Sequence, residues 1–202
     1  MKVVITSQNE GKIIEFRNML SKSGLEVISQ AEYMPEESIN VIEDGKTFAE
    51  NALKKVTIFP ATSECIFMGD DSGLEVEALN GAPGVKSARY AGPNASGKEL
   101  CETLLKALSG IQDRRARFTT VIAIRWGAHV DTVSGSIEGI IAEKMCGEGG
   151  FGYDPVFIPD GYQMTFAEMS SEEKNAISHR RKAIDRACRV VEGGRSIEIL
   201  SD

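Results

Sequence analysis

Two adjacent carboxylates, Asp70 and Asp71, are the residues whose type and spacing most directly indicate chemistry. They lie in the stretch 69–74 and follow the apolar run 65–68, which predicts a buried strand. We expect the pair at the end of that strand, where open α/β sheets bind ligands. Carboxylate oxygens suit a divalent cation, and a carboxylate beside a metal can orient and deprotonate water. The alternative is a turn in which the Asp and Ser side chains cap backbone groups.

The loop 7–12 is a second candidate, because it joins a predicted strand over 2–6 to a predicted helix. That helix is indicated by apolar residues at helical spacing, namely Ile13, Phe16, Met19 and Leu20. Backbone N–H groups and a lysine at a helix N-terminus form a natural anion site. The alternative is a polar turn with Lys12 in solvent. The glycine spacing of a Walker loop is absent.

The segment 43–55 adds a carboxylate and a lysine. Thr47 and Glu50 form a capping box, which predicts a helix over 48–58. Glu43 then lies in the preceding loop, where it either binds a metal or favours the helix dipole. Lys55 is placed either to point at a phosphate or to remain in solvent.

Two glycine-containing segments match nucleotide-binding motifs, but the residues that follow them do not fit those motifs. The segment 92–98 matches G-x-x-x-x-G-K, but Glu99 follows where Ser or Thr binds magnesium, and Ser96 with Glu99 forms a capping box instead. The segment 147–152 fits G-x-G-x-x-G, but Tyr153 follows where a helix begins in a dinucleotide fold. We expect this second loop either to stack a planar ring or to form a hairpin turn with core aromatics.

The elements that position these residues indicate an α/β fold. The β-rich segments 117–126 and 129–142 are joined by two residues, which predicts a long hairpin and therefore a mixed sheet. Ser178 is a good N-cap, so His179 and Arg180 fall in the first turn of a helix. Cations there oppose the helix dipole, and this conflict indicates a functional position.

Composition narrows the class of protein. The chain has 202 residues, 42% of them hydrophobic, and this length and composition favour one domain. Its net charge of −7 disfavours a nucleic-acid polymer as partner. The first apolar run is too short for a signal peptide, and no 18-residue apolar stretch occurs, so we expect no membrane partner. The four cysteines are widely spaced, which is typical of reduced cytoplasmic thiols.

Six short motifs follow one another along nearly the whole chain. They are Ser7-x-Asn9-x-x-Lys12, Thr47-Phe48-x-Glu50-Asn51-Ala52, Asp70-Asp71-Ser72-Gly73-Leu74, Gly84-Val85-x-Ser87-Ala88-Arg89-Tyr90, Phe151-Gly152-Tyr153-Asp154-Pro155 and Ser178-His179-Arg180. This combination resembles the inosine triphosphate pyrophosphatases of the Ham1/RdgB type. The sequence departs from the family pattern at Gln8, where many relatives carry a small residue.

The resemblance implies hydrolysis of ITP, dITP and XTP to the monophosphate and pyrophosphate with Mg²⁺. It implies Asp71 as general base and metal ligand, and Glu43 as a second metal ligand. The implied substrate contacts are Ser7, Gln8, Asn9, Glu10, Gly11, Lys12, Lys55 and Ser72, chiefly at the phosphates, and Phe151, Gly152, Tyr153, Asp154, Lys174, His179 and Arg180 at the base. It also implies one domain over 1–202 with an elongated, twisted mixed sheet flanked by helices, two lobes with a central cleft, and a homodimer.

Donors such as His179 and Arg180 would bond the 6-carbonyl of hypoxanthine or xanthine and be left unpaired opposite the amino group of adenine. Two alternatives remain open. One is a non-catalytic nucleotide-binding module, and the other is a phosphotransferase, which ranks lower because the P-loop pattern fails at Glu99.

Overall fold

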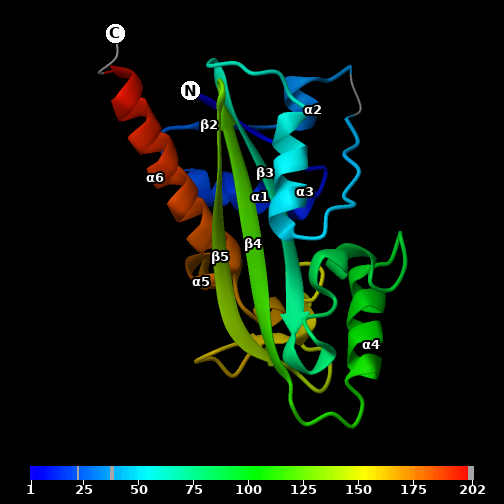
Figure 1. The fold of residues 1–202 in the computed structure, drawn as a ribbon. Helices are drawn as coiled ribbons and strands as arrows, with labels where there is room; N and C mark the ends of the chain where they lie inside the picture. Colours follow the sequence, from blue (N-terminus) through cyan, green and yellow to red (C-terminus); the bar gives the residue numbers. More distant parts are fainter. Residues whose placement is uncertain (22, 37–38, 200–202) are drawn as a thin grey trace. The chain divides into compact units, whose positions relative to one another are not determined.

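Six strands form one mixed sheet in the order β2-β1-β3-β4-β5-β6 in the computed structural model, which describes residues 1–21, 23–36 and 39–199 (Figure 1). The strands are β1 (Lys2–Ile5), β2 (Glu26–Ser29), β3 (Cys65–Val76), β4 (Arg115–Trp126), β5 (His129–Ile141) and β6 (Phe157–Pro159). β1 pairs in parallel with both β2 and β3, whereas β6 pairs antiparallel with β5. The predicted mixed sheet is therefore confirmed.

The predicted hairpin is also confirmed. Gly127 and Ala128 alone separate β4 from β5, and Gly127 has a φ of 58°. That left-handed conformation is available to glycine without strain, and it suits a two-residue turn between antiparallel strands. His129 lies at this turn and is exposed, as expected.

The helices are α1 (Glu10–Leu20), α2 (Gln30–Tyr33), α3 (Phe48–Thr57), α4 (Gly97–Ala107), α5 (Ser171–Ile177) and α6 (His179–Ile199). Short 3₁₀ turns occur at Glu77–Leu79, Gly84–Arg89, Asp154–Val156 and Phe166–Glu168. None of the helices formed by the described residues is long and apolar enough to cross a membrane.

The chain divides into two compact units, consistent with two lobes. Unit 1 comprises Met1–Asp71, Val121–Gly135 and Arg180–Asp202, and unit 2 comprises Ser72–Thr120 and Ser136–His179. Strands β3, β4 and β5 each pass from one unit into the other along the chain. A cleft between the lobes, and a single domain over 1–202, stay predictions.

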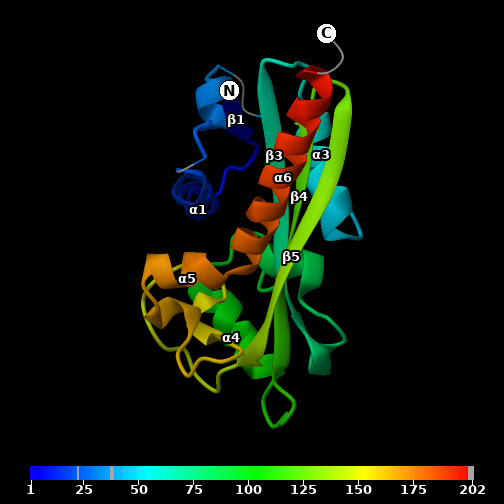
Figure 2. The ribbon, with the colours of Figure 1, turned by 90° about the vertical axis from the view of Figure 1, so that its left-hand side faces the viewer.

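In unit 1, hydrophobic side chains pack on both faces of the strands. Val3 and Ile5 of β1 lie in one cluster with Phe16 of α1 and Ile184 of α6, whereas Val4 lies in another with α3. Successive strand residues point to opposite faces, so each strand contributes to both clusters. Helices α6 and α3 accordingly cover opposite faces of this part of the sheet (Figure 2).

Unit 2 has its own core, which contains a group of packed aromatic side chains. Phe118 of β4 packs edge-on against Phe157 of β6 with ring centroids 4.7 Å apart, and Phe166 stacks 6.1 Å from Phe118. Leu100 and Leu104 of α4 complete this core from the helical side. Both are buried, as expected for a helix that presents one apolar face.

Local capping explains where the helices begin. Ser96 and Glu99 form both halves of the capping box that starts α4, so the G-x-x-x-x-G-K match is a helix start and not a P-loop. At α3, Thr47 Oγ1 accepts a hydrogen bond from Glu50 N at 3.1 Å, as predicted. The Glu50 carboxylate, however, accepts from Lys46 N at 2.7 Å, so the reciprocal half of the predicted box is made one residue earlier.

The sequence prediction was wrong about two local elements. β3 does not end before the acid pair but continues through it to Val76. Its parallel neighbour β1 ends at Ile5, opposite Met68, while β4 continues beside it, so the aspartates lie beyond β1 and still within a strand. The stretch after Ser29, for which no helix was predicted, contains α2, which begins at a capping box between Ser29 and Glu32.

Candidate active site

Asp71 lies in a buried polar cluster against α3. Its Oδ2 accepts a hydrogen bond from Asn51 Nδ2 at 2.9 Å, and its Oδ1 lies 3.9 Å from Lys55 Nζ. Asn51 is fully buried, and its Oδ1 accepts from Gly45 N at 2.8 Å, which fixes the orientation of the amide. The pair on α3 therefore holds the Asp71 carboxylate from two directions.

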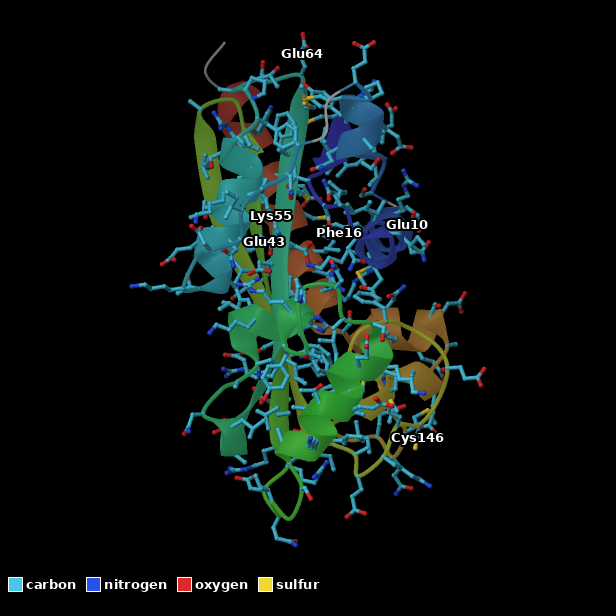
Figure 3. The ribbon with its side chains drawn as sticks, turned by 90° about the vertical axis from the view of Figure 1, so that its right-hand side faces the viewer. Glu10, Phe16, Glu43, Lys55, Glu64 and Cys146 are labelled. Atoms are coloured by element: carbon cyan, nitrogen blue, oxygen red, sulfur yellow. The ribbon has the colours of Figure 1, made fainter. Side chains whose placement is uncertain are left out.

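Lys55 is not a solvent-exposed lysine. Its ammonium lies 3.0 Å from Glu43 Oε1 and donates to the Asp70 carbonyl at 2.8 Å, and the residue is only 6% exposed. Figure 3 shows Glu43 and Lys55 side by side at α3. A Cβ on Gly69 would lie 2.7 Å from Lys55 Cβ, so this glycine permits the close approach of the helix.

The surroundings of Asp71 alter its proton affinity. Burial raises the pKa of the Asp71 carboxyl, and Lys55 and Asn51 oppose that shift only in part. A general base works best when its pKa approaches the operating pH, so a raised pKa in this buried carboxylate fits that role.

Asp70 faces the other side of β3, where it meets two cations. The carboxylate is fully buried, with Oδ2 3.0 Å from Lys12 Nζ of α1 and 3.5 Å from Arg180 Nη2 of α6. Burial alone would raise the pKa of Asp70, but Lys12, Arg180 and Lys55 outweigh it and hold that pKa well below its usual range. Asp70 is therefore ionised and engaged in ion pairs.

Glu15 completes this network and was not foreseen from the sequence. Its Oε2 pairs with Arg180 Nη1, so two buried carboxylates balance two cations. This pairing also resolves the conflict of a cation in the first turn of α6. The sequence signal for the burial of Glu15 was its position between Ile13 and Phe16, on a helix with an apolar face.

Local hydrogen bonds order the segment 7–12 at the start of α1. Asn9 caps α1 by accepting from Lys12 N at 3.1 Å, and Ser7 Oγ accepts from Asn9 N at 3.2 Å. Burial lowers the pKa of Lys12, although Asp70 opposes that shift. Ser7 and Glu10 also line a cavity of about 760 Å³ within unit 1.

Gln8 has a definite structural partner. Its Nε2 donates to the Ile39 carbonyl at 3.0 Å, and Gln30 Nε2 donates to the same oxygen at 3.0 Å. The two amides tie the segment that leads to Glu43 onto the first loop and α2. Gln30 was not singled out in the sequence, and no periodicity marks it.

In unit 2, Asp154 organises the loop after the glycine run. Its Oδ2 accepts from Phe151 N at 2.8 Å and from Lys174 Nζ at 2.6 Å, and the residue is 3% exposed. Lys174 Nζ also lies 4.8 Å from the centroid of the Phe151 ring. A Cβ on Gly150 would lie 2.0 Å from Asp154 Oδ2, and Gly150 has a φ of 71°, so only glycine fits there.

Three further predicted site residues lie beside these clusters. His179 is 3% exposed and stacks on Phe118 with centroids 4.7 Å apart and an interplanar angle of 8°. Ser72 Oγ lies 2.7 Å from Thr120 Oγ1. Tyr153 donates from its hydroxyl to the Ser87 carbonyl at 2.9 Å, and burial raises its pKa.

The predicted site residues thus form one group in each unit. The first group contains the loop 7–12, Glu43, Lys55, Asp71 and Arg180, and the second contains Ser72, the loop 151–154, Lys174 and His179. The chain crosses between the units at four bonds, and two of them, Asp71–Ser72 and His179–Arg180, join predicted site residues.

Glu43 and Asp71 are the candidate metal ligands. The described residues include no group of three or more His, Cys, Asp or Glu side chains that would hold an ion alone. Glu43 and Asp71 instead share one cation, the Lys55 ammonium. Mg²⁺ is typically held by one or two carboxylates together with substrate phosphates, and these two carboxylates fit that mode.

The whole chain, apart from its ends, matches the Ham1 family, over residues 3–190. The chain belongs to the Ham1 family. This Ham1 chain is 45% identical over 194 residues to a protein of Desulforamulus reducens named dITP/XTP pyrophosphatase, covering 95% of this chain and 96% of that protein.

Solved structures agree with this assignment. The Ham1 protein of Staphylococcus aureus is 41% identical, with a TM-score of 0.83, covering 96% of this chain and all of that one. A HAM1 protein from Coxiella burnetii is 39% identical, with a TM-score of 0.82, covering 96% of this chain and 99% of that one. The family and the α/β fold class predicted for this Ham1 chain are confirmed.

Proposed function

We propose that this Ham1 chain hydrolyses the non-standard purine nucleoside triphosphates dITP, XTP and ITP to the monophosphate and pyrophosphate. The observation that carries the proposal is Asp71, a buried carboxylate with a raised pKa that is held by Asn51 and Lys55 beside Glu43. The name of the Desulforamulus reducens relative supports the substrate class. Removal of such nucleotides would cleanse the nucleotide pool.

Asp71 acts as the general base. It takes a proton from water, which attacks the α-phosphorus in line with the bond to the leaving pyrophosphate. Asn51 and Lys55 hold the carboxylate in place, with Oδ2 hydrogen-bonded to the Asn51 amide and Oδ1 3.9 Å from the Lys55 ammonium. Because Lys55 lies between Glu43 and Asp71, it keeps the two carboxylates together before substrate arrives.

Glu43 and Asp71 would hold Mg²⁺, which neutralises phosphate charge and lowers the pKa of bound water when it is present. The triphosphate is bound at the N-terminus of α1, where backbone N–H groups of the loop 7–12 and the Lys12 ammonium are donors. Ser72 belongs to the same set of substrate contacts.

The base is bound by the loop 151–154 with Lys174, His179 and Arg180. Phe151 offers a ring for stacking, and Lys174 and His179 offer donors for a 6-carbonyl. A site built to donate to that carbonyl leaves donors unpaired opposite the amino group of adenine. Such a mismatch lowers kcat/KM for the adenine nucleotide by several orders of magnitude. Arg180 already donates to Glu15 and Asp70, so these ion pairs also fix the first turn of α6 within unit 1.

One assay tests the reaction. The protein is incubated with dITP, XTP or ATP and Mg²⁺, and released pyrophosphate and orthophosphate are measured separately. Pyrophosphate from dITP and XTP, with little from ATP, is the expected result. Orthophosphate would indicate a different cleavage, and nucleotide binding without any release would indicate the binding module.

A cytoplasmic location and a homodimer are also part of this proposal. All four cysteines are free thiols, which fits a reducing compartment. The dimer rests on the family resemblance, and light scattering of the purified protein measures it directly.

A further inference from the structure

The backbone of Gly152, in the loop proposed to bind the base, lies against the first turn of α4. Cys101 Sγ donates a hydrogen bond to the Gly152 carbonyl at 3.3 Å. A Cβ built on Gly97 would lie 3.3 Å from both Gly152 N and Gly152 O. All three residues belong to unit 2, and Cys101 is fully buried.

The neighbours of Gly152 in the loop are fixed by other elements. Phe151 N donates to Asp154, which Lys174 holds in turn, and the Tyr153 hydroxyl donates to the Ser87 carbonyl. Gly152 has no side chain to anchor it, and its φ is 61°. Its position is therefore set by what its peptide groups contact, namely α4.

Ser87 is itself a fixed partner. Its Oγ donates to the Gly84 carbonyl at 2.6 Å and accepts from Leu74 N at 2.9 Å. The motif 84–90 thus connects the end of β3 to the Tyr153 hydroxyl. The contact with α4 supports the centre of the loop, between the positions of Phe151 and Tyr153.

We infer that Gly97 and Cys101 are positioning residues for base recognition, because the first turn of α4 sets the place of the Gly152 peptide and hence the orientation of the Phe151 ring. The inference rests on the proposed function and deepens it. Gly97 is needed for close approach of two backbones, not for phosphate binding, which explains the second glycine of the G-x-x-x-x-G-K match.

The chemistry of Cys101 suits a permanent donor. Burial raises the pKa of its thiol to about 12, so the proton remains on sulfur at neutral pH. A thiol is a weak donor, but a buried carbonyl that loses its partner is destabilised. Removing the thiol therefore frees the Gly152 peptide to shift.

Gly97→Ala separates positioning from stability. Alanine favours a helix over glycine, so the variant should unfold at the same temperature as the wild type or higher. Its methyl group lies in tight contact with Gly152, which must move by a few tenths of an ångström. We expect the KM for dITP and the Kd for dIMP, measured by calorimetry, to rise about tenfold while kcat stays within about twofold.

Cys101→Ala should raise the same two constants about threefold, and Cys101→Ser, which keeps a donor, should lie nearer the wild type. Lys98→Ala is the matched control, because Lys98 lies in the same turn of α4 with its side chain 74% exposed. It should leave both constants unchanged. If Gly97→Ala fails to fold, the two Cys101 variants carry the test.

Wild-type turnover is measured first, and the absence of pyrophosphate release from dITP would overturn the proposed function itself. Normal wild-type turnover, with unchanged dIMP affinity and KM in the folded Gly97 and Cys101 variants, would overturn only the positioning inference. A parallel fall of kcat and melting temperature would also overturn it, because that pattern indicates a merely structural role.

Discussion

Asp70→Asn should destabilise unit 1 strongly, although the substitution hardly changes the volume of the side chain. In the wild type, the carboxylate is fully buried and pairs with Lys12 at 3.0 Å and Arg180 at 3.5 Å. At an effective dielectric constant of about 20, each pair contributes a gross attraction of about 5 kcal/mol. Desolvation offsets much of this attraction, but removing the Asp70 charge leaves the Lys12 and Arg180 cations without that partner, and Glu15 pairs with Arg180.

Breaking a buried pair in this way costs about 3–5 kcal/mol, which in a chain of this size lowers the melting temperature by roughly 6–20 °C. The single tryptophan, Trp126, lies in unit 1, so its fluorescence in a urea titration reports on that unit. Asp44→Asn is the matched control, because Asp44 pairs with Lys54 at an exposed position and such pairs contribute about 0–1 kcal/mol.

The double variant Asp70→Asn/Lys12→Gln tests the cause. It removes one charge of each sign, so we expect it to recover part of the stability lost in Asp70→Asn. The reasoning would be refuted if Asp70→Asn lowered the free energy of unfolding no more than Asp44→Asn does. It would also be refuted if the double variant lost as much stability as the two single variants together.

Three further predictions concern catalysis. Asp71→Asn should lower kcat for dITP by about 10²–10⁴-fold while dITP binding by calorimetry largely survives, and near-normal turnover would reject Asp71 as the base. The raised pKa of Asp71 means that the carboxyl gains its proton at a higher pH than an ordinary aspartate. Wild-type kcat/KM should therefore fall as the pH drops through that raised pKa, and a profile flat to pH 4 would contradict this assignment. His179→Ala or Arg180→Ala should compress the ratio of kcat/KM for ITP over ATP, whereas an equal loss for both nucleotides would indicate a phosphate or structural role.

Helices α1, α3, α4 and α6 and the hairpin could be predicted because their signals are local, whereas α2 and α5 were not predicted. Asn9 and Ser96 cap helices through contacts three residues away, and the turn at Gly127 needs only two residues. The family could be predicted because six motifs occur together in one order. Local signals were weaker for α2, whose capping box at Ser29 was overlooked within a polar stretch.

The contacts of the site were harder to predict from the sequence, because the residues that form them are distant along the chain. Nothing near Glu15 indicates that it pairs with Arg180, which lies 165 residues away. The end of β3 was misplaced because Asp and Gly are poor strand formers, yet β4 continues the pairing past the end of β1. Gln8 and Gln30 meet at one carbonyl of a segment whose path the sequence does not specify.

Because β3 runs without interruption, its odd-numbered and even-numbered side chains face opposite sides of the sheet. Asp70 and Asp71 are neighbours in the chain, yet one faces α1 and α6 with a lowered pKa and the other faces α3 with a raised pKa. A strand that advances by one residue exchanges the faces of all its side chains. Insertion or deletion of a single residue before Gly69 would therefore turn each carboxylate to the face of the strand that the other now occupies. A relative in which β3 differs in length must therefore keep each of the two acids on its own face of the strand, and not only keep two acids in sequence.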